Sequence, residues 1–410
     1  MTERMDALTT PSNWQKVRLG DIAEIKRGAS PRPIENPKWF CANSNVGWVR
    51  ISDISKNSRF LYKTAQKLSK KGIEKSRFIK QNSLIMSMCA TIGKPIITKI
   101  DTCIHDGFVV FENPKIDLNY LYYFLCYIEK EWLESGQQGS QVNLNVDLIK
   151  NKEVFYPKDL NEQIAIANIL SDVDHYLCSL DALILKKESV KKALRIKMLN
   201  QILASNGVEF RELGDIILSL KTGLNPRSFF KLNTPNANNY YVTIRELEDY
   251  TIKFTHQTDR IDDNALSLCL KRSNLEKDDI LFSGTGTIGK VSIIEKNPNN
   301  WAIKEGIYSI KPNKKIVFPR FLMFCLESSN IQNDIKNKSF GGIVKSIPMN
   351  DLQQIQIPLP PLNEQIAIAN ILSDLDHEII SLKNKKRQFD NIKKALNHDL
   401  MSAKIRVLKK

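Results

Sequence analysis

Hydrophobic residues recur at helical spacing in two long segments of the chain. In the first segment the apolar positions are Ile166, Leu170, Val173, Leu177, Leu180 and Ile184, followed by Leu194 and Met198. In the second they are Ile368, Leu372, Leu375, Ile379 and Leu382, followed by Phe389, Leu396 and Leu400. Steps of four and three residues are the heptad spacing at which two helices pack along a common seam. Each segment is therefore predicted to be a helix of about 40 residues, roughly 60 Å long.

Local signals indicate where these helices begin and where their seams are broken. Prolines precede both segments and cannot continue a helix backwards. Asn161 and Asn363 are the predicted N-caps, because an Asn side chain can accept hydrogen bonds from the first free N–H groups. Lysines interrupt the apolar seams at equivalent places, with Lys191 in the first helix and Lys393 in the second.

The two helical segments are copies of one another. Residues 160–175 have the sequence Leu-Asn-Glu-Gln-Ile-Ala-Ile-Ala-Asn-Ile-Leu-Ser-Asp-Val-Asp-His, which recurs 202 positions later at residues 362–377 with one difference, Leu for Val. The tetrapeptide Lys-Lys-Ala-Leu at 191–194 recurs at the same offset. A repeat of this fidelity indicates an internal duplication of the chain.

The stretches before the two helices also match, but more weakly. Leu-Gly-Asp-Ile at 19–22 recurs at 213–216, and Thr-Ile-Gly-Lys at 91–94 recurs at 287–290. The order is thus module, helix, module, helix, with variable modules and constant helices. The predicted parts are residues 1–156 (first module), 157–206 (first helix), 207–357 (second module) and 358–410 (second helix).

The heptad pattern leaves two packing arrangements open. The helices can bury their seams against each other as an antiparallel pair, which would give a pseudo-twofold molecule, or each helix can pack on its own module. Their basic faces can be solvated surface or can approach a phosphate backbone. These faces comprise Lys186, Lys187, Lys191, Lys192, Arg195 and Lys197 in the first helix, and Lys383, Lys385, Lys386, Arg387, Lys393 and Lys394 in the second.

Composition points to a folded protein that binds a polyanion. The 410 residues include 60 Lys and Arg against 45 Asp and Glu, a net charge of +15 that suits nucleic acid or an anionic membrane surface. No apolar run approaches the roughly 20 residues that span a bilayer. Because the first residues are polar, we expect a cytoplasmic protein without a membrane partner. The seven cysteines are isolated and odd in number, which predicts buried free thiols instead of a zinc site or disulfides.

Motifs for catalysis are absent or incomplete. Gly284–Lys290 has the G-x-x-x-x-G-K spacing of a phosphate-binding loop, but Val291 stands where that loop needs Ser or Thr for Mg²⁺. The residues after it are typical of a strand, so a glycine turn between two strands is predicted there. The five histidines are scattered, without metal-ligand spacing. The chain is predicted to be non-catalytic and to bind no metal.

The duplicated order and the repeated Leu-Asn-Glu-Gln motif closely resemble the specificity (S) subunit of type I restriction-modification systems, over essentially the whole chain. The resemblance implies a mixed α/β (α+β) fold. It implies two pseudo-twofold-related target recognition domains, one in each module, separated by a long antiparallel two-helix coiled coil. Each domain is expected to recognise one half of a bipartite, asymmetric DNA site. The paired helices are expected to fix the spacer between the halves and to dock two methyltransferase subunits.

The same resemblance places the chemistry on other subunits. The methyltransferase subunits are expected to bind S-adenosylmethionine and to methylate adenine. A motor-nuclease subunit is expected to use ATP and Mg²⁺ and to cut unmodified DNA. This chain itself is expected to hold no cofactor, which agrees with its missing catalytic motifs.

Candidate contact residues follow from side-chain chemistry, because Arg, Lys, Asn and Gln form the commonest hydrogen bonds to base edges and phosphates. The candidate DNA-binding residues are Lys26, Arg27, Ser30, Arg32, Lys94, Gln138, Ser140, Gln141 and Asn143 in the first module, and Lys221, Thr222, Asn225, Arg227, Lys290, Lys345 and Ser346 in the second. The candidate methyltransferase-docking residues are Glu162, Gln163, Ile166, Asn168, Glu364, Gln365, Ile368 and Asn370. The repeated polar residues could instead stabilise the helix starts.

Two other classes of protein stay open. A coiled-coil scaffold without DNA contact would share the helices but has no evident use for the positive charge. A nucleotide-binding enzyme would need the loop at residues 284–290 to bind phosphate, and ATP binding by the purified chain would distinguish it.

Overall fold

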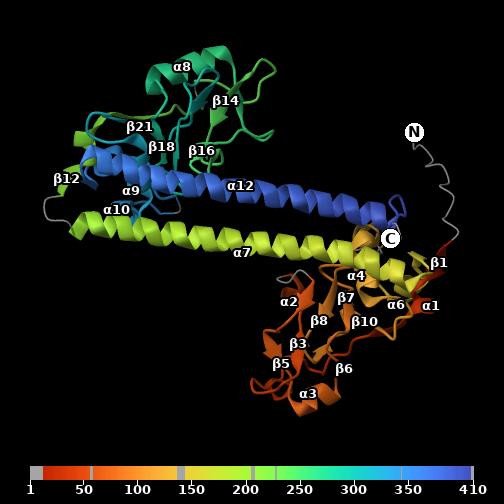
Figure 1. Cartoon of the computed structure of the whole chain (residues 1–410). Helices are drawn as coiled ribbons and strands as arrows, with labels where there is room; N and C mark the ends of the chain where they lie inside the picture. The colour runs from red at the N-terminus through yellow and green to blue at the C-terminus, as the bar shows by residue number, and fades with distance from the viewer. Residues whose placement is uncertain are drawn as a thin grey trace. The chain divides into compact units, whose positions relative to one another are not determined.

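The computed structural model describes residues 13–55, 59–135, 144–204, 208–226, 229–342 and 344–407. By packing, the chain divides into two compact units: unit 1 is Met1–Leu180 with Lys386–Lys410, and unit 2 is Asp181–Lys385. Each unit combines one mixed α/β module with parts of two long helices, so the predicted fold class is confirmed (Figure 1). Within the described residues, every helix is too short or too polar to cross a membrane.

Unit 1 contains three sheets and the helices that cover them. Its strands are β1 (Trp14–Arg18), β2 (Glu24–Arg27), β3 (Gly47–Val49), β4 (Phe60–Leu61), β5 (Gln66–Lys67), β6 (Arg77–Ile79), β7 (Leu84–Ser87), β8 (Pro95–Thr98), β9 (Thr102–Ile104), β10 (Phe108–Glu112) and β11 (Glu153–Pro157). Its helices are α1 (Leu19–Ile22), the 3-10 helix η1 (Pro37–Trp39), α2 (Ile51–Ser55), α3 (Lys70–Glu74), α4 (Leu118–Tyr127), α5 (Glu129–Ser135), α6 (Val146–Asn151) and the first part of α7 (Leu160–Ala204). The sheet orders are β2-β10-β7-β8-β4, β5-β3-β9-β6 and β1-β11.

Unit 2 repeats this plan. Its strands are β12 (Glu209–Glu212), β13 (Ile217–Thr222), β14 (Asn239–Val242), β15 (Leu247–Glu248), β16 (Thr251–Ile252), β17 (Arg260–Ile261), β18 (Ile280–Ser283), β19 (Val291–Ile293), β20 (Trp301–Ile303), β21 (Ile307–Pro312) and β22 (Gln356–Leu359). Its helices are the 3-10 helix η2 (Leu213–Ile216), α8 (Asp263–Ser273), α9 (Pro319–Glu327), α10 (Ser329–Asn337), α11 (Met349–Gln353) and the first part of α12 (Leu362–Met401). The sheet orders are β13-β21-β18-β19, β17-β14-β20, β12-β22 and β15-β16.

Strand pairing shows that the two modules are structural copies. The order β2-β10-β7-β8 corresponds to β13-β21-β18-β19, and β1-β11 corresponds to β12-β22. Both modules contain an equivalent parallel strand pair: Trp48 lies opposite Cys103 in β3 and β9, and Tyr241 lies opposite Ala302 in β14 and β20. The first module has a second parallel pair, β4 with β8. The weak sequence repeat in the modules therefore reflects a duplication of the whole fold.

The core of unit 1 joins the module to both long helices. Ile166 and Leu170 of α7 are buried in the same cluster as Tyr120 of α4 and the strands beneath it. Leu400 and Met401 of α12 complete that cluster. Each of the two predicted packing arrangements is thus correct in part, because the start of α7 packs on its own module while the end of α12 covers the same core.

The two glycine loops are hairpins, as predicted. In unit 2, β18 and β19 pair antiparallel on either side of the loop, and Gly286 and Gly289 adopt positive φ angles of 79° and 92°. In unit 1, β7 and β8 flank the equivalent loop, where Gly93 has a φ of 75°. Glycine is favoured at such angles because it has no Cβ. A phosphate-binding loop requires a helix directly after it, and a strand stands at that place here.

Two local predictions were wrong. The N-cap predictions failed because α7 and α12 begin one residue before the proposed caps. At the start of α7 the carboxylate of Asp159, and not the side-chain amide of Asn161, accepts the hydrogen bond, from the N–H of Asn161 at 2.9 Å. The cysteines are free, but Cys41 and Cys178 are exposed and not buried. An isolated cysteine carries no periodic signal that would have placed it inside or outside.

Substitution of Gly28 tests how closely the backbone of the first module is packed. A Cβ at Gly28 would lie 2.0 Å from the carbonyl oxygen of His105, and backbone cannot move aside cheaply. We expect Gly28→Ala to lower the free energy of unfolding of unit 1 by about 2–3 kcal/mol, measured by chemical denaturation. Gly342→Ala is the control, since a Cβ there meets nothing within 4 Å. Equal stability of the two variants would contradict this packing.

Candidate functional site

A buried glutamine joins each long helix to its module by hydrogen bonds to main-chain groups. Gln163 is 3% exposed, and its amide donates to the carbonyl of Pro157 at 2.8 Å while its oxygen accepts from the N–H of Asp117 at 2.8 Å. Gln365, 1% exposed, accepts from the N–H of Phe318 at 2.8 Å in the same way. Asp117 and Phe318 are the N-cap residues of α4 and α9. Each glutamine therefore links three elements and explains why the helix starts are constant.

The helix-start candidates consequently fall into two groups. Gln163 and Gln365 face inward, Ile166 is fully buried, and Ile368 is packed against the core of unit 2. Glu162 is half-buried and accepts hydrogen bonds from Asn13 and Trp14. The exposed members of the predicted docking set are Asn168, Glu364 and Asn370.

Sequence reasoning missed exposed apolar side chains at the same helix starts. Leu160 and Ile164 are 52% and 38% exposed, and Leu362 and Ile366 are 38% and 37% exposed. They occupy equivalent places in the repeat, three residues before and one residue after the buried glutamine. The signal was present in the sequence, as identical apolar residues outside the heptad seam, but periodicity alone could not decide which apolar residues were covered.

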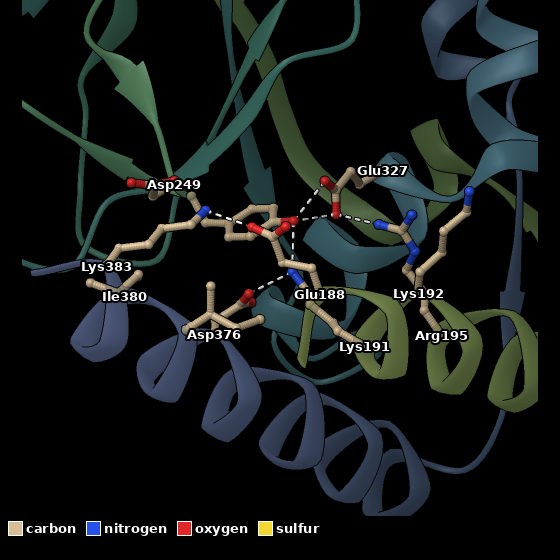
Figure 2. Close-up of a pocket in the computed structure, with 11 residues that line it drawn as sticks. Glu188, Lys191, Lys192, Arg195, Asp249, Glu327, Asp376, Ile380 and Lys383 are labelled. Atoms are coloured by element: carbon tan, nitrogen blue, oxygen red, sulfur yellow. Dashed lines mark hydrogen bonds and ion pairs between the residues drawn. The ribbon is translucent and has the colours of Figure 1, made fainter. Parts of the chain in front are cut away.

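A buried ion pair crosses between α7 and α12 in unit 2. Lys191 is 8% exposed, and its Nζ lies 2.5 Å from Oδ1 of Asp376 (Figure 2). The same ammonium donates to the hydroxyl of Tyr250 at 2.7 Å and lies 4.1 Å from the centre of that ring. Burial raises the pKa of Asp376, and the hydrogen bond from Lys191 acts in the opposite direction. Arg195 and Glu327 form a neighbouring ion pair at 2.6 Å.

Unit 1 holds the equivalent ion pair with the helices exchanged. Lys393 of α12 pairs with Asp174 of α7, and the hydroxyl of Tyr123 donates to Asp174 at 2.7 Å. Burial raises the pKa of Tyr123, as it does that of Tyr250. The lysines that interrupt the apolar seams are therefore partners of aspartates that lie inside the repeated motif.

These pairs show that the helices run antiparallel within each unit. In unit 2, Lys187 pairs with Glu378 and, further along α7, Lys191 pairs with Asp376. In unit 1, the ring centroids of Tyr176 and Phe389 are 4.6 Å apart. Residue numbers rise along one helix as they fall along the other. Several lysines of the predicted basic faces are thus engaged with carboxylates, and do not form an unpaired basic stripe.

In unit 1 the structure gathers three of the candidate DNA-binding residues around Asp106, two of them on its carboxylate. Ser30 donates to Oδ1 of Asp106 at 2.7 Å, Arg32 lies 3.2 Å from Oδ2, and Arg27 donates to the main-chain oxygen of Asp106 at 2.7 Å. The hydrogen bond from Ser30 is the main cause that lowers the pKa of Asp106, which is therefore ionised at neutral pH. Lys26 instead forms ion pairs with Glu24 of its own strand β2 and with Glu112 of the neighbouring strand β10.

In unit 2 the structure brings Thr222, Asn225 and Ser346 to the wall of one cleft. Asn225 donates to Oε2 of Glu305 at 2.9 Å, as Ser30 does to Asp106 in unit 1. Sequence reasoning missed both carboxylates, although Ile-His-Asp-Gly at 104–107 and Ile-Lys-Glu-Gly at 303–306 stand at matching places in the two modules.

The remaining candidates lie apart from these clefts or outside the described residues. Lys94 and Lys290 occupy the equivalent hairpins, and Lys290 donates to the carbonyl of Leu247 at 3.2 Å. Lys221 lies on β13, and Lys345 is exposed beside the hairpin of unit 2, where its carbonyl accepts from Gly286. The candidates outside the described residues are Gln138, Ser140, Gln141, Asn143 and Arg227.

Comparison with known proteins identifies the family. A model of the type I restriction modification DNA specificity domain matches residues 11–187 and again residues 205–389. The chain belongs to this family. Each match contains one module and the first part of the helix that follows it. The segment that defines the family is therefore the segment that is duplicated in this chain. The resemblance seen in the sequence is confirmed.

Individual relatives match over the whole length. The MjaX specificity subunit of a type I restriction enzyme of Methanocaldococcus jannaschii is 27% identical, covering 97% of this chain and 95% of its own. The MjaVIII specificity subunit of the same organism is 24% identical, covering 99% and 96%. The crystal structure of the S subunit of a type I restriction-modification system from M. genitalium has a TM-score of 0.60 at 16% identity, covering 96% of this chain and 97% of the other, and shows the same fold.

In the described part of the chain, no group of three His, Cys, Asp or Glu residues is arranged to hold a metal ion. The ion pairs between α7 and α12 line one pocket of unit 2 (Figure 2). Their role is to select the pairing of the helices, because a buried charge is costly without its partner.

The ion pair of Lys191 with Asp376 can be tested by a double-mutant cycle. We expect Lys191→Met alone to lower the free energy of unfolding of unit 2 by about 3–5 kcal/mol, because it leaves a buried carboxylate unpaired. Lys191→Met with Asp376→Leu should cost clearly less than the sum of the single changes. Lys192→Met, at an exposed neighbouring position, is the control and should change stability by less than about 0.5 kcal/mol. Additive effects in the cycle would refute the coupling.

Proposed function

We propose that this specificity subunit recognises a bipartite, asymmetric DNA site, with one half bound by each module. The observation on which the proposal rests is the contrast between constant and variable parts. The helix starts are identical except at one position, whereas the modules share a fold but differ in the polar residues that line their clefts. Two copies of the same partner require two identical surfaces, which the helix starts provide. Two different DNA half-sites require two different surfaces, which the modules provide.

The paired helices α7 and α12 are proposed to fix the spacer between the two half-sites. Their register in each unit is held by a Lys–Asp ion pair, which is buried at Lys191 in unit 2 and half-buried at Lys393 in unit 1. A helix cannot slide past its partner without separating that pair, so the distance encoded by the helices is kept. This is a positional role and requires no chemistry in the chain.

The helix starts are proposed to dock two methyltransferase subunits through the duplicated exposed apolar residues Leu160, Ile164, Leu362 and Ile366 together with the exposed polar residues near them. Apolar side chains that remain exposed at the same place in two copies are suited to a partner that binds twice. S-adenosylmethionine is expected on these methyltransferase subunits, and ATP and Mg²⁺ on motor-nuclease subunits of the full complex. No catalytic step is assigned to this chain.

Methylation mapping tests the proposed function. The chain is expressed with its neighbouring methyltransferase subunit, and modified bases in the cellular DNA are located by single-molecule sequencing. We expect a split motif with methylated adenine in both halves, which disappears when this chain is omitted. A stable complex that produces no motif would identify the chain as a scaffold without sequence recognition.

The docking surface is tested by changing the exposed apolar residues. We expect Ile164→Asp with Ile366→Asp to reduce co-purification of the methyltransferase subunit at least tenfold, because a charge cannot enter an apolar contact without losing its hydration. Both side chains are exposed, so the free chain should unfold at the wild-type midpoint. Lys71→Asp, at an exposed position of α3, is the control and should co-purify normally. Unchanged co-purification of the double variant would remove this surface from the interface.

A further inference from the structure

Each unit contains an open cleft beside one parallel strand pair, β3 with β9 in unit 1 and β14 with β20 in unit 2. The cleft of unit 1 has a volume of about 450 Å³, and its lining includes Ser30, Arg50, Ile51, His105 and Asp106. The cleft of unit 2 has a volume of about 610 Å³, and its lining includes Asn225, Thr243, Ile244, Lys304 and Glu305. These linings come from the same places in the two folds.

Strand register establishes the correspondence. Val49 of β3 lies opposite Ile104 of β9, and Val242 of β14 lies opposite Ile303 of β20. The chain enters the cleft directly after each of these four residues. Arg50 therefore corresponds to Thr243, and His105 corresponds to Lys304, without reliance on the weak sequence match of the modules.

The backbone of the cleft is held in the same way in both modules. The N–H of Arg50 donates to the carboxylate of Asp53 at 2.9 Å, and the N–H of Thr243 donates to the carboxylate of Glu246 at 2.8 Å. Asp53 and Glu246 are buried, so these turns are rigid. The same hydrogen bond from a main-chain N–H to a buried carboxylate is therefore present in both modules, while the side chains at the cleft differ.

A carboxylate stands in both clefts, although the chain carries a net charge of +15. Asp106 is held by Ser30, and Glu305 is held by Asn225. A carboxylate repels phosphate, so a surface that only bound the DNA backbone would not keep one at this place in both copies. A carboxylate does accept hydrogen bonds from the amino group of cytosine, which is a contact to a base edge.

The positions around the carboxylates differ in hydrogen-bonding chemistry. Arg50 is exposed, and no described residue pairs with its guanidinium, which leaves it able to bond both acceptors of guanine. Thr243 offers one hydroxyl at the matching place. His105 is half-buried, and burial lowers its pKa, so it is neutral at pH 7 and is not a phosphate-binding cation. Lys304, its counterpart, is exposed.

We propose that each cleft binds base edges of one half-site, and that the residues at its three variable positions determine which bases are accepted. The variable positions are Ser30 and Asn225, Arg50 and Thr243, and His105 and Lys304. This inference deepens the proposed function and rests on it: the function states that the modules recognise DNA, and the inference states which surface of each module does so.

Methylation mapping of cleft variants tests the inference, with the other module as an internal control. We expect Arg50→Ala to relax the motif at one base pair of one half-site and to reduce methylation of the wild-type site about tenfold, with the other half-site unchanged. Thr243→Arg should change the motif only in that other half-site. Lys71→Ala, at an exposed position of α3 outside the cleft, should leave both half-sites as they are.

The outcomes separate the inference from the proposed function. If the wild-type chain directs methylation to a split motif and both cleft variants keep that motif, the clefts are not the recognition surface and the inference is wrong while the function stands. If Arg50→Ala retains its unfolding midpoint but loses methylation equally at all sequences, Arg50 binds phosphate and the inference is also overturned. If the wild-type chain produces no motif, both fail together.

Discussion

The buried Lys–Asp ion pair between α7 and α12 is the interaction on which the rest of the structure depends. Each compact unit combines segments that are far apart in the chain, since unit 1 is completed by residues 386–410. An apolar seam alone tolerates a shift of one heptad, because leucine packs against leucine in either register. A lysine that is 8% exposed does not, because a shift would leave it and Asp376 unpaired in the interior. The ion pair thus selects one antiparallel register.

The same interaction explains why the two helices have diverged so little. Asp174 and Asp376 lie inside the repeated motif, and their lysine partners lie in the second repeated stretch of the opposite helix. Each helix supplies the aspartate of one pair and the lysine of the other. A change in either helix therefore removes a partner from one of the two pairs, and the buried glutamines impose a similar constraint at the helix starts.

The two modules, unlike the two helices, differ in sequence while they keep the same fold. Their rigid parts, which are the hairpins, the parallel strand pairs and the buried Asp53 and Glu246, are matched in the two copies. The cleft positions are not matched, as Arg50 and Thr243 show. A constant frame with a variable lining allows new DNA sequences to be recognised without a change in how the module folds. It also separates the general attraction of a basic chain for DNA, which comes from net charge, from the choice of sequence, which depends on a few side chains.

The sequence by itself determined the duplicated order, the two long helices, the mixed α/β class, the hairpin in place of a phosphate-binding loop and the family. The order, the helices and the hairpin follow from periodicity, repeats and the chemistry of single residue types, which are local properties. The fold class and the family follow from the resemblance that the repeated motif carries. Only the tertiary structure decided that Gln163 is an internal fastener, that Leu160 and Ile164 are exposed, and that Asp106 and Arg50 share a cleft. Burial and contact depend on which segments meet in space, and a segment's own sequence does not specify its distant neighbours.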